Sequence, residues 1–247
     1  MPKFSILTAC HNDKKFLPAT VKSVLAQNFS DWEWVIVDDC STDRSYEYLK
    51  QIKDKRVRLF RNDGRLYCSS TYARALIESE GEICGVLDAD DALVCDAVKT
   101  VFKRYNRFYG ISYIYTQHAW CDSKLRRKRR GLSSAPPGNM SFVDAALKKR
   151  HCFSHWRTFR RCIVQDIDAF FPPGLKYAVD KHMGFALEEL GKGAFFPREL
   201  YLYRYYKGNM SLTEARSQKN RWLEFAKIYS EKRTRGLSKA HPIEVIK

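Results

Sequence analysis

The chain has 247 residues, of which 45% are hydrophobic and 29% charged, and these values exclude a disordered, collagen-like or coiled-coil protein. Lys and Arg number 44 against 28 Asp and Glu, so the formal net charge is +16. This excess predicts an acidic partner, which could be nucleic acid, an anionic lipid surface or a phosphorylated small molecule.

The sequence contains no stretch close to the roughly 20 apolar residues of a transmembrane helix. Its first apolar run is too short for a secretory signal, because His11, Asn12 and Asp13 interrupt it. The eight cysteines form no C-x-x-C pair, which argues against a structural zinc site and favours a reducing compartment. We therefore expect a cytoplasmic protein.

Apolar runs of strand length alternate with helical patterns through the first half of the chain. Short apolar strands separated by helices are typical of βαβ units, whose right-handed crossovers build a parallel sheet covered on both faces. The pattern predicts an α/β fold with a mostly parallel central sheet flanked by helices. Strands are expected at 4–9, 32–37, 57–60, 82–87 and 109–116, and helices near 16–28, 43–52, 70–80 and 96–108.

The pattern changes after about residue 117. The basic run KLRRKRR (124–130) and the turn-forming residues that follow it predict a mobile basic loop over about 122–140. A helix is expected around 180–193 and another over 214–234. The last helix places four apolar residues at helical spacing, namely Trp222, Phe225, Ala226 and Tyr229.

Aspartates directly follow two of the expected strands. Asp38 and Asp39 close the second strand, and Asp88, Asp90 and Asp91 close the fourth. Ligands of open α/β sheets bind outside the carboxyl ends of the strands, so these acids are expected at one edge. A divalent cation would relieve their repulsion, and Asp88 and Asp90 offer the oxygen ligands that Mg²⁺ or Mn²⁺ prefers. Each Asp could instead cap the following helix.

Two phosphate-binding motifs are missing from the sequence. No G-x-G-x-x-G follows the first strand, and no G-x-x-x-x-G-K-[ST] occurs anywhere. A dinucleotide cradle and a Walker-type loop are therefore unsupported. A metal held by Asp88 and Asp90 would be the natural means of neutralising a diphosphate.

Four segments, FSILTACHND, SVLAQNFSDWE, WVIVDDCSTD and EGEICGVLDADD, resemble the family 2 inverting glycosyltransferases of the GT-A fold. The resemblance is close over 3–105 and weaker up to about 212. It implies a single GT-A catalytic domain at 1–212, with a nucleotide-sugar-binding half (1–105) and an acceptor half (106–212). A C-terminal helical tail would follow at 213–247.

The resemblance implies a role for each of several residues. Asp39 would accept a hydrogen bond from the pyrimidine ring, and Asp88 and Asp90 would hold Mn²⁺ or Mg²⁺ against the diphosphate. Asp180 would be the catalytic base, unless it only caps the helix that it begins, and His11 could be a surface loop residue. The nucleotide-sugar would contact Thr8, Ala9, His11, Asp38, Asp39, Arg65, Asp88 and Ala89.

The chain departs from the family pattern at three places. The helix before the fourth strand lacks the Arg of the family's Ala-Arg-Asn, so Arg65 or Arg74 would substitute for it. A family histidine that follows the late Tyr-Arg pair is missing, and the acid usually found before the base is Val179. The positions concerned are Thr71, Tyr72 and Ala73 for the first departure and Tyr205 and Tyr206 for the second.

The sequence thus predicts a metal-dependent inverting glycosyltransferase that moves a sugar from a nucleotide-sugar, with UDP expected, to a hydroxyl of a glycan or lipid-linked glycan. The basic loop and tail helix suggest peripheral contact with an anionic membrane, although the loop could be simply solvated and the helix packed on the core.

Two other readings stay open. One is a catalytically silent GT-A-like protein that binds anionic surfaces or nucleic acid, although the absence of a nucleic-acid-binding motif argues against the latter. The other is a nucleotidyltransferase, which the missing Gly-rich loop disfavours.

Overall fold

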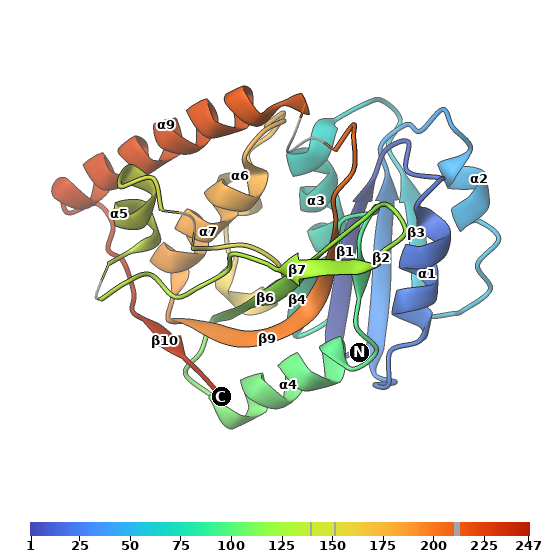
Figure 1. Ribbon diagram of the computed structural model, residues 1–247, viewed down its shortest axis with the longest axis horizontal. Coiled ribbons are helices and arrows are strands. Elements are labelled where there is room, and N and C mark those ends of the chain that lie inside the picture. Colours follow the sequence, from blue (N-terminus) through green and yellow to red (C-terminus); the bar gives the residue numbers. More distant parts are fainter. Residues whose placement is uncertain (139, 151, 210–212) are drawn as a thin grey trace.

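The structure is a computed structural model that describes residues 1–138, 140–150, 152–209 and 213–247. A central sheet carries helices on both faces (Figure 1). The strands are β1 (Phe4–Cys10), β2 (Trp32–Asp38), β3 (Val57–Arg61), β4 (Ile83–Val86), β5 (Ala92–Leu93), β6 (Tyr113–Cys121), β7 (Arg127–Arg130), β8 (Arg157–Arg160), β9 (Gly193–Arg204) and β10 (Ile243–Val245). The helices are α1 (Leu17–Leu25), α2 (Ser45–Leu49), α3 (Tyr67–Glu78), α4 (Ala97–Arg107), α5 (Phe142–Leu147), α6 (Ile167–Phe170), α7 (Val179–Leu190), α9 (Ala215–Thr234) and the 3₁₀ turn η1 (Arg161–Ile163).

The strand order of the sheet is β10-β9-β6-β8-β4-β1-β2-β3, with β5 paired to β9 and β7 paired to β6. Strands β3, β2, β1 and β4 run parallel, as expected for βαβ units. β8 enters antiparallel to both β4 and β6, so the predicted, mostly parallel sheet includes antiparallel pairs in the second half of the chain. Antiparallel neighbours need no crossover helix, and the second half of the chain accordingly loses the regular alternation of strand and helix.

Two hydrophobic cores cover the two faces of the sheet. One packs α1, α2 and α4 against residues such as Ile6 and Ile36, and the other packs α3, α5, α7 and α9 against residues such as Leu7 and Val35. Successive residues of one strand therefore serve opposite cores, and both kinds are apolar. This double burial explains why β1, β2 and β4 appear in the sequence as continuous apolar runs.

The basic run does not form a loop throughout. Arg127–Arg130 forms β7, which pairs antiparallel with β6 and places Arg129 opposite Trp120. All four side chains of β7 are exposed, so the run has no apolar alternation by which a strand could be recognised. Of the segment 122–140, residue 139 lies outside the described residues.

The tail helix α9 packs on the core. Ala226 and Tyr229 are buried and Trp222 and Phe225 partly so, against the cluster that includes α5 and α7. Its apolar stripe thus faces the protein, which is the alternative to a membrane-binding face. The tail also supplies β10, which pairs with β9. None of the helices in the described ranges combines the length and apolar character that crossing a bilayer requires.

The expected boundary between the catalytic domain and the tail, at 212/213, falls at residues 210–212, which lie outside the described residues.

Candidate active site

The loop after β4 carries Asp88, whose carboxylate is the centre of a hydrogen-bonded group. Tyr72 Oη donates to Asp88 Oδ1 over 2.6 Å, and Arg157 Nη2 and His155 Nε2 lie 3.1 and 3.2 Å from Oδ2. Burial by itself would raise the pKa of Asp88, but the charge of Arg157 and the contact with His155 hold that pKa well below its usual range. Asp88 is therefore an ionised acid at the predicted edge of the sheet.

Arg157, on β8, joins this acid to the predicted base. Its side chain is only 5% exposed, and its Nη1 lies 3.9 Å from Asp180 Oδ2. Asp180 lies in the first turn of α7, where Lys181 Nζ is 3.2 Å from the same carboxylate oxygen. The structure thus brings together one acid from each half of the chain, and a buried guanidinium lies between them.

Two further acids beside Asp88 have raised pKa values. Burial and the charge of Asp88 raise the pKa of Asp90 to about 6, although Tyr206 Oη donates to Asp90 Oδ2 over 3.1 Å. Burial and the charge of Asp90 raise the pKa of Asp13, in the loop after β1, to about 8. Acids that raise one another's pKa are stabilised by a cation, so the residues present suit a divalent metal ion.

A possible ligand group is formed by Asp88, Asp91 and His155. One ligand atom from each lies within 4.8 Å of the others. Asp91 is buried, and both of its carboxylate oxygens accept hydrogen bonds from β9, at 2.6 and 2.8 Å. This group differs from the predicted pair of Asp88 and Asp90, because the Asp90 carboxylate contacts Tyr206 and is not a member of it.

Asp38 and Asp39, at the end of β2, are both buried. Asp39 Oδ1 accepts hydrogen bonds from Asn62 Nδ2 and the Leu66 backbone N–H, at 2.9 and 2.8 Å, and Oδ2 accepts one from the Tyr67 N–H at 2.9 Å. Asp38 Oδ2 accepts a 3.1 Å hydrogen bond from a backbone N–H in the following turn. Both acids therefore fix the loops beside the predicted nucleotide pocket, and Asp39 already uses both oxygens.

The other residues predicted to contact the nucleotide-sugar differ in their exposure to solvent. Ala9 and His11 are partly exposed at the same edge, and His11 Nδ1 lies 2.7 Å from the Asp39 carbonyl oxygen. Thr8 is fully buried, and its hydroxyl accepts a 2.9 Å hydrogen bond from the Trp34 indole. Its side chain therefore faces the core and not the pocket, which corrects the expected contact. Ala89 is buried too.

Arg65 and Arg74, the two candidates to substitute for the family Arg, both lie apart from the arginine that contacts Asp88. Arg65 is exposed, with its guanidinium 5.1 Å from the ring centre of Tyr67. Arg74 donates to the Arg61 carbonyl and to Asn62 Oδ1, at 2.6 and 2.9 Å. Arg157 contacts Asp88 from a different strand.

Sequence reasoning missed Arg157, His155, Asp13 and the tyrosines that contact Asp88. Arg157 belongs to the segment SHWRTF, in which Trp156 and Phe159 are fully buried. A charged residue inside an aromatic run is a usable signal, because a buried arginine requires an acidic partner. Tyr72 occupies a position where the family pattern has Arg, and its hydroxyl now reaches Asp88.

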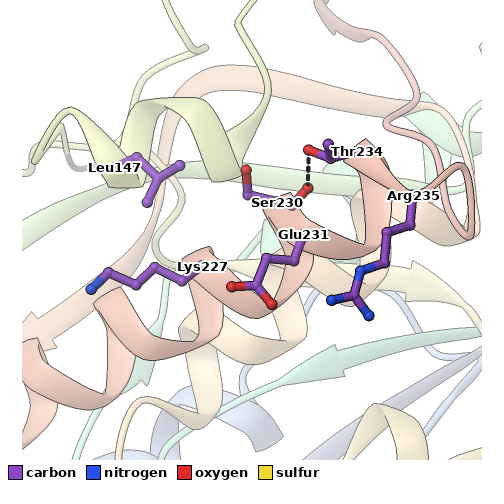
Figure 2. A pocket seen from close by; sticks show the side chains of 6 residues that line it. All are labelled: Leu147, Lys227, Ser230, Glu231, Thr234 and Arg235. Carbon is purple, nitrogen blue, oxygen red and sulfur yellow. Dashed lines mark hydrogen bonds between the residues drawn. The ribbon is translucent and has the colours of Figure 1, made fainter.

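A cavity of about 250 Å³ lies elsewhere, between α5 and α9 (Figure 2). Its wall is mostly one face of α9, where the Thr234 hydroxyl donates to the Ser230 carbonyl over 3.0 Å. None of the predicted site residues borders it, so the candidate chemistry stays at the sheet edge. The lining residues are Leu147, Lys227, Ser230, Glu231, Thr234 and Arg235.

The chain is similar in sequence and in fold to several known proteins. The family model described as "Glycosyl transferase family 2" matches residues 5–168. The putative colanic acid biosynthesis glycosyl transferase WcaA of Escherichia coli K12 is 23% identical over 188 residues, which are 71% of this chain and 67% of WcaA. The Escherichia coli UDP-Glc:alpha-D-GlcNAc-diphosphoundecaprenol beta-1,3-glucosyltransferase WfaP is 31% identical over 121 residues, 44% of this chain and 47% of WfaP.

The fold matches that of the Staphylococcus aureus TarS fragment 1–349, solved in complex with UDP-GlcNAc. The TM-score is 0.70 at 19% sequence identity, over 84% of this chain and 60% of that one. The chain thus spans 47% of WfaP, 60% of this TarS fragment and 67% of WcaA. Because the family model covers well over half of the sequence and the architecture is the GT-A fold, the chain belongs to the family 2 glycosyltransferases.

Proposed function

We propose that the chain is a metal-dependent inverting glycosyltransferase that moves a sugar from a UDP-sugar to a hydroxyl of a glycan or lipid-linked glycan. The observation that carries this proposal is the contact of one buried side chain, Arg157, with Asp88 and with Asp180. The names of two relatives support the choice of substrates, since TarS was solved with UDP-GlcNAc and WfaP is named for UDP-Glc and a diphosphoundecaprenol-linked acceptor.

The donor end of the site is the acidic group at the carboxyl ends of β1 and β4. Asp88 and Asp90 would hold Mn²⁺ or Mg²⁺, with Asp91 and His155 as further candidate ligands. A bound ion would stabilise the negative charge that develops on the departing nucleoside diphosphate. Asp13, Asp88 and Asp90 favour such an ion because their mutual repulsion falls when it binds.

The acceptor end is Asp180. A hydroxyl is a weak nucleophile near neutral pH, and general-base removal of its proton contributes about 10²–10⁴-fold to the rate. Asp180 would take this proton while the oxygen attacks the anomeric carbon from the face opposite to the leaving diphosphate, which inverts that carbon. Arg157 and Lys181 orient the carboxylate for this step.

We place the reaction in the cytoplasm, which the eight free cysteines support. A lipid-linked acceptor would bring the enzyme to the membrane surface as a peripheral protein.

Calorimetric titration with UDP tests the donor half of the proposal. We expect UDP to bind at least about tenfold more tightly with Mn²⁺ than with EDTA, because two carboxylates and a diphosphate share the ion. Asp90→Asn should remove most of this difference, whereas Asp31→Asn, at an acid on the amino side of β2, should leave it intact. Negligible binding under both conditions would refute UDP as the nucleotide.

A further inference from the structure

Aromatic side chains on β6, on β9 and in the segments just before β8 and after β9 form a row that begins at the acids of the site. Trp120 on β6 lies opposite Tyr203 on β9. The His155 ring, whose Nε2 is 3.2 Å from Asp88, stacks on Tyr203 with the ring centres 5.0 Å apart. Tyr203 and Trp120 follow at 5.5 Å, and Trp120 and Tyr205 at 4.7 Å. We call His155, Tyr203, Trp120 and Tyr205 the aromatic row.

The aromatic row reaches the surface beneath a cation. Trp120, Tyr203 and Tyr205 are partly exposed, in contrast to the buried Tyr201 that begins the same face of β9. The Arg129 guanidinium lies over the Trp120 ring, 4.4 Å from its centre. The row therefore runs from a candidate catalytic centre to an exposed arginine.

Arg129 differs in its partners from Arg127 and Lys128 on β7. Arg127 donates to both carboxylate oxygens of Glu199, at 2.8 and 2.9 Å, and Lys128 lies 3.3 Å from Asp122. Arg129 has no carboxylate within ion-pair distance in the part of the chain that the structure describes. Its charge is therefore available to an anion that lies against Trp120.

The two parts of this surface select different features of one ligand. Partly exposed Tyr and Trp rings offer a flat apolar face with a polar edge, which suits the C–H face and the hydroxyl groups of a sugar ring. A guanidinium is a planar donor that matches a carboxylate or a phosphate. The net charge of +16 attracts the same kind of ligand.

We propose that the aromatic row with Arg129 binds the acceptor, and that the acceptor is an anionic glycan bearing carboxylate or phosphodiester groups. This inference rests on the proposed function, because the row is assigned to the acceptor only through its position beside Asp88 and Asp180. A sugar hydroxyl beside His155 would lie next to the donor site, while more distant units of the same glycan stack on Trp120 and Tyr205 and an acidic group meets Arg129.

Equilibrium binding of glycans in the absence of donor tests whether the aromatic row and Arg129 bind the acceptor. The whole chain is titrated at ~150 mM salt, where non-specific charge effects are reduced. The probes are a short oligogalacturonide, a short glycerol-phosphate oligomer, a neutral gluco-oligosaccharide of the same length, and inorganic polyphosphate. We expect the oligogalacturonide or the glycerol-phosphate oligomer to bind about tenfold more tightly than the neutral oligosaccharide and polyphosphate. Only the two anionic glycans combine a polyol or ring surface with charge. The tighter of the two identifies the acidic group.

Variants assign the binding to the proposed side chains. Arg129→Ala should weaken the anionic probe about tenfold and leave the neutral one unchanged, whereas Tyr205→Ala should weaken both about threefold or more. Arg107→Ala is the matched control, because Arg107 is also exposed and lies 5.4 Å from the ring centre of Phe108 at the end of α4. The control should bind every probe as the unmodified chain does.

Three outcomes would overturn the proposal for the aromatic row. The first is that polyphosphate, RNA or anionic vesicles bind as tightly as the anionic glycans. The others are that Arg129→Ala has no effect on binding, or that Arg107→Ala weakens binding as much as Arg129→Ala does. Titration with UDP and Mn²⁺ on the same samples separates the two proposals. If UDP binds normally but the anionic glycans do not bind to the aromatic row, only the proposal of an anionic acceptor is refuted. Glycan binding with no UDP binding refutes the proposed donor and leaves the glycan-binding surface in place.

Discussion

Arg157 is the residue on which the geometry of the site depends most. Its guanidinium contacts Asp88 through one nitrogen and approaches Asp180 through the other. A lysine keeps the charge but is a compact point charge with no planar fork, so it cannot hold two carboxylates in the same positions. The separation of the two acids would then follow the side chain that replaces the arginine.

We expect Arg157→Lys to lower kcat about 10²-fold and to change the donor KM much less, since a misplacement of about 1 Å at reacting groups costs that much. Steady-state kinetics over a range of donor concentrations measures the split. Arg160→Lys, on the same strand but paired with Glu82 at the surface, is the matched control. A fall in kcat that is matched by a large fall in melting temperature would point to a merely structural role.

Asp180→Asn tests the base itself. The amide keeps the size of the side chain but cannot take a proton, so transfer should fall by about 10²–10⁴-fold. UDP affinity should stay nearly unchanged, because Asp180 lies on the acceptor side. Asp168→Asn is the control, since Asp168 occupies the first turn of α6 and is exposed. Transfer at the unmodified rate would remove Asp180 from the role.

At the scale of elements, the sequence predicts the buried strands and misses a strand that is defined only by its pairing with a neighbour. β1, β2 and β4 are mostly apolar and almost wholly buried, because helices cover both faces of the sheet. β7 consists of basic residues that face solvent, and only its pairing with β6 makes it a strand. Strand propensity depends on such neighbours more than on the segment itself.

The candidate site divides in the same way. Asp88 was predicted because it follows a clear strand, and Asp180 because its segment resembles the part of the family that carries the base. Arg157 was not, since its position beside both acids is set by the antiparallel insertion of β8, a pairing between residues far apart in sequence. Asp13 was missed because a loop acid gains its raised pKa from burial and from acids that the fold brings near it, Asp90 above all.

A buried ion pair fastens α9 to α7. Arg233 Nη2 donates to Glu188 Oε2 over 2.8 Å, and the Glu188 side chain is fully buried. Glu188 Oε1 also accepts a 2.5 Å hydrogen bond from the backbone N–H of Phe142, at the start of α5. One carboxylate thus connects three helices.

We expect Arg233→Met to lower the free energy of unfolding by about 3–5 kcal/mol, because it leaves a buried carboxylate without its cation. Urea denaturation followed by circular dichroism measures the change. Arg235→Met, two residues further on at an exposed position, should cost no more than about 0.5 kcal/mol. Equal effects of the two substitutions would contradict the account.

At the scale of the molecule, the tail is part of the domain and not an appendage. α9 completes the core that contains Tyr229, and β10 extends the central sheet beside β9 (Figure 1). One continuous sheet therefore runs beneath both sides of the candidate site, and residues that follow 212 complete its edge and its core.

A chain that ends at residue 212 should accordingly fail to unfold cooperatively, because it exposes the apolar surface that Ala226 and Tyr229 cover. A chain that ends at residue 238 keeps α9 and lacks only β10, so it should remain folded with a lower melting temperature. Differential scanning calorimetry of the two truncations and the full chain distinguishes these outcomes. A sharp transition in the shorter chain would show that the tail is dispensable.

The position of β8 also limits how the enzyme can move. β8 is hydrogen-bonded to β4 on one side and to β6 on the other, and the same strand carries Arg157. A hinge that swung the donor side away from the acceptor side would tear this ladder and pull the guanidinium from its acids. We therefore expect any movement that accompanies substrate entry or product release to be confined to the loops above the sheet, because the ladder beneath them holds β4, β8 and β6 together.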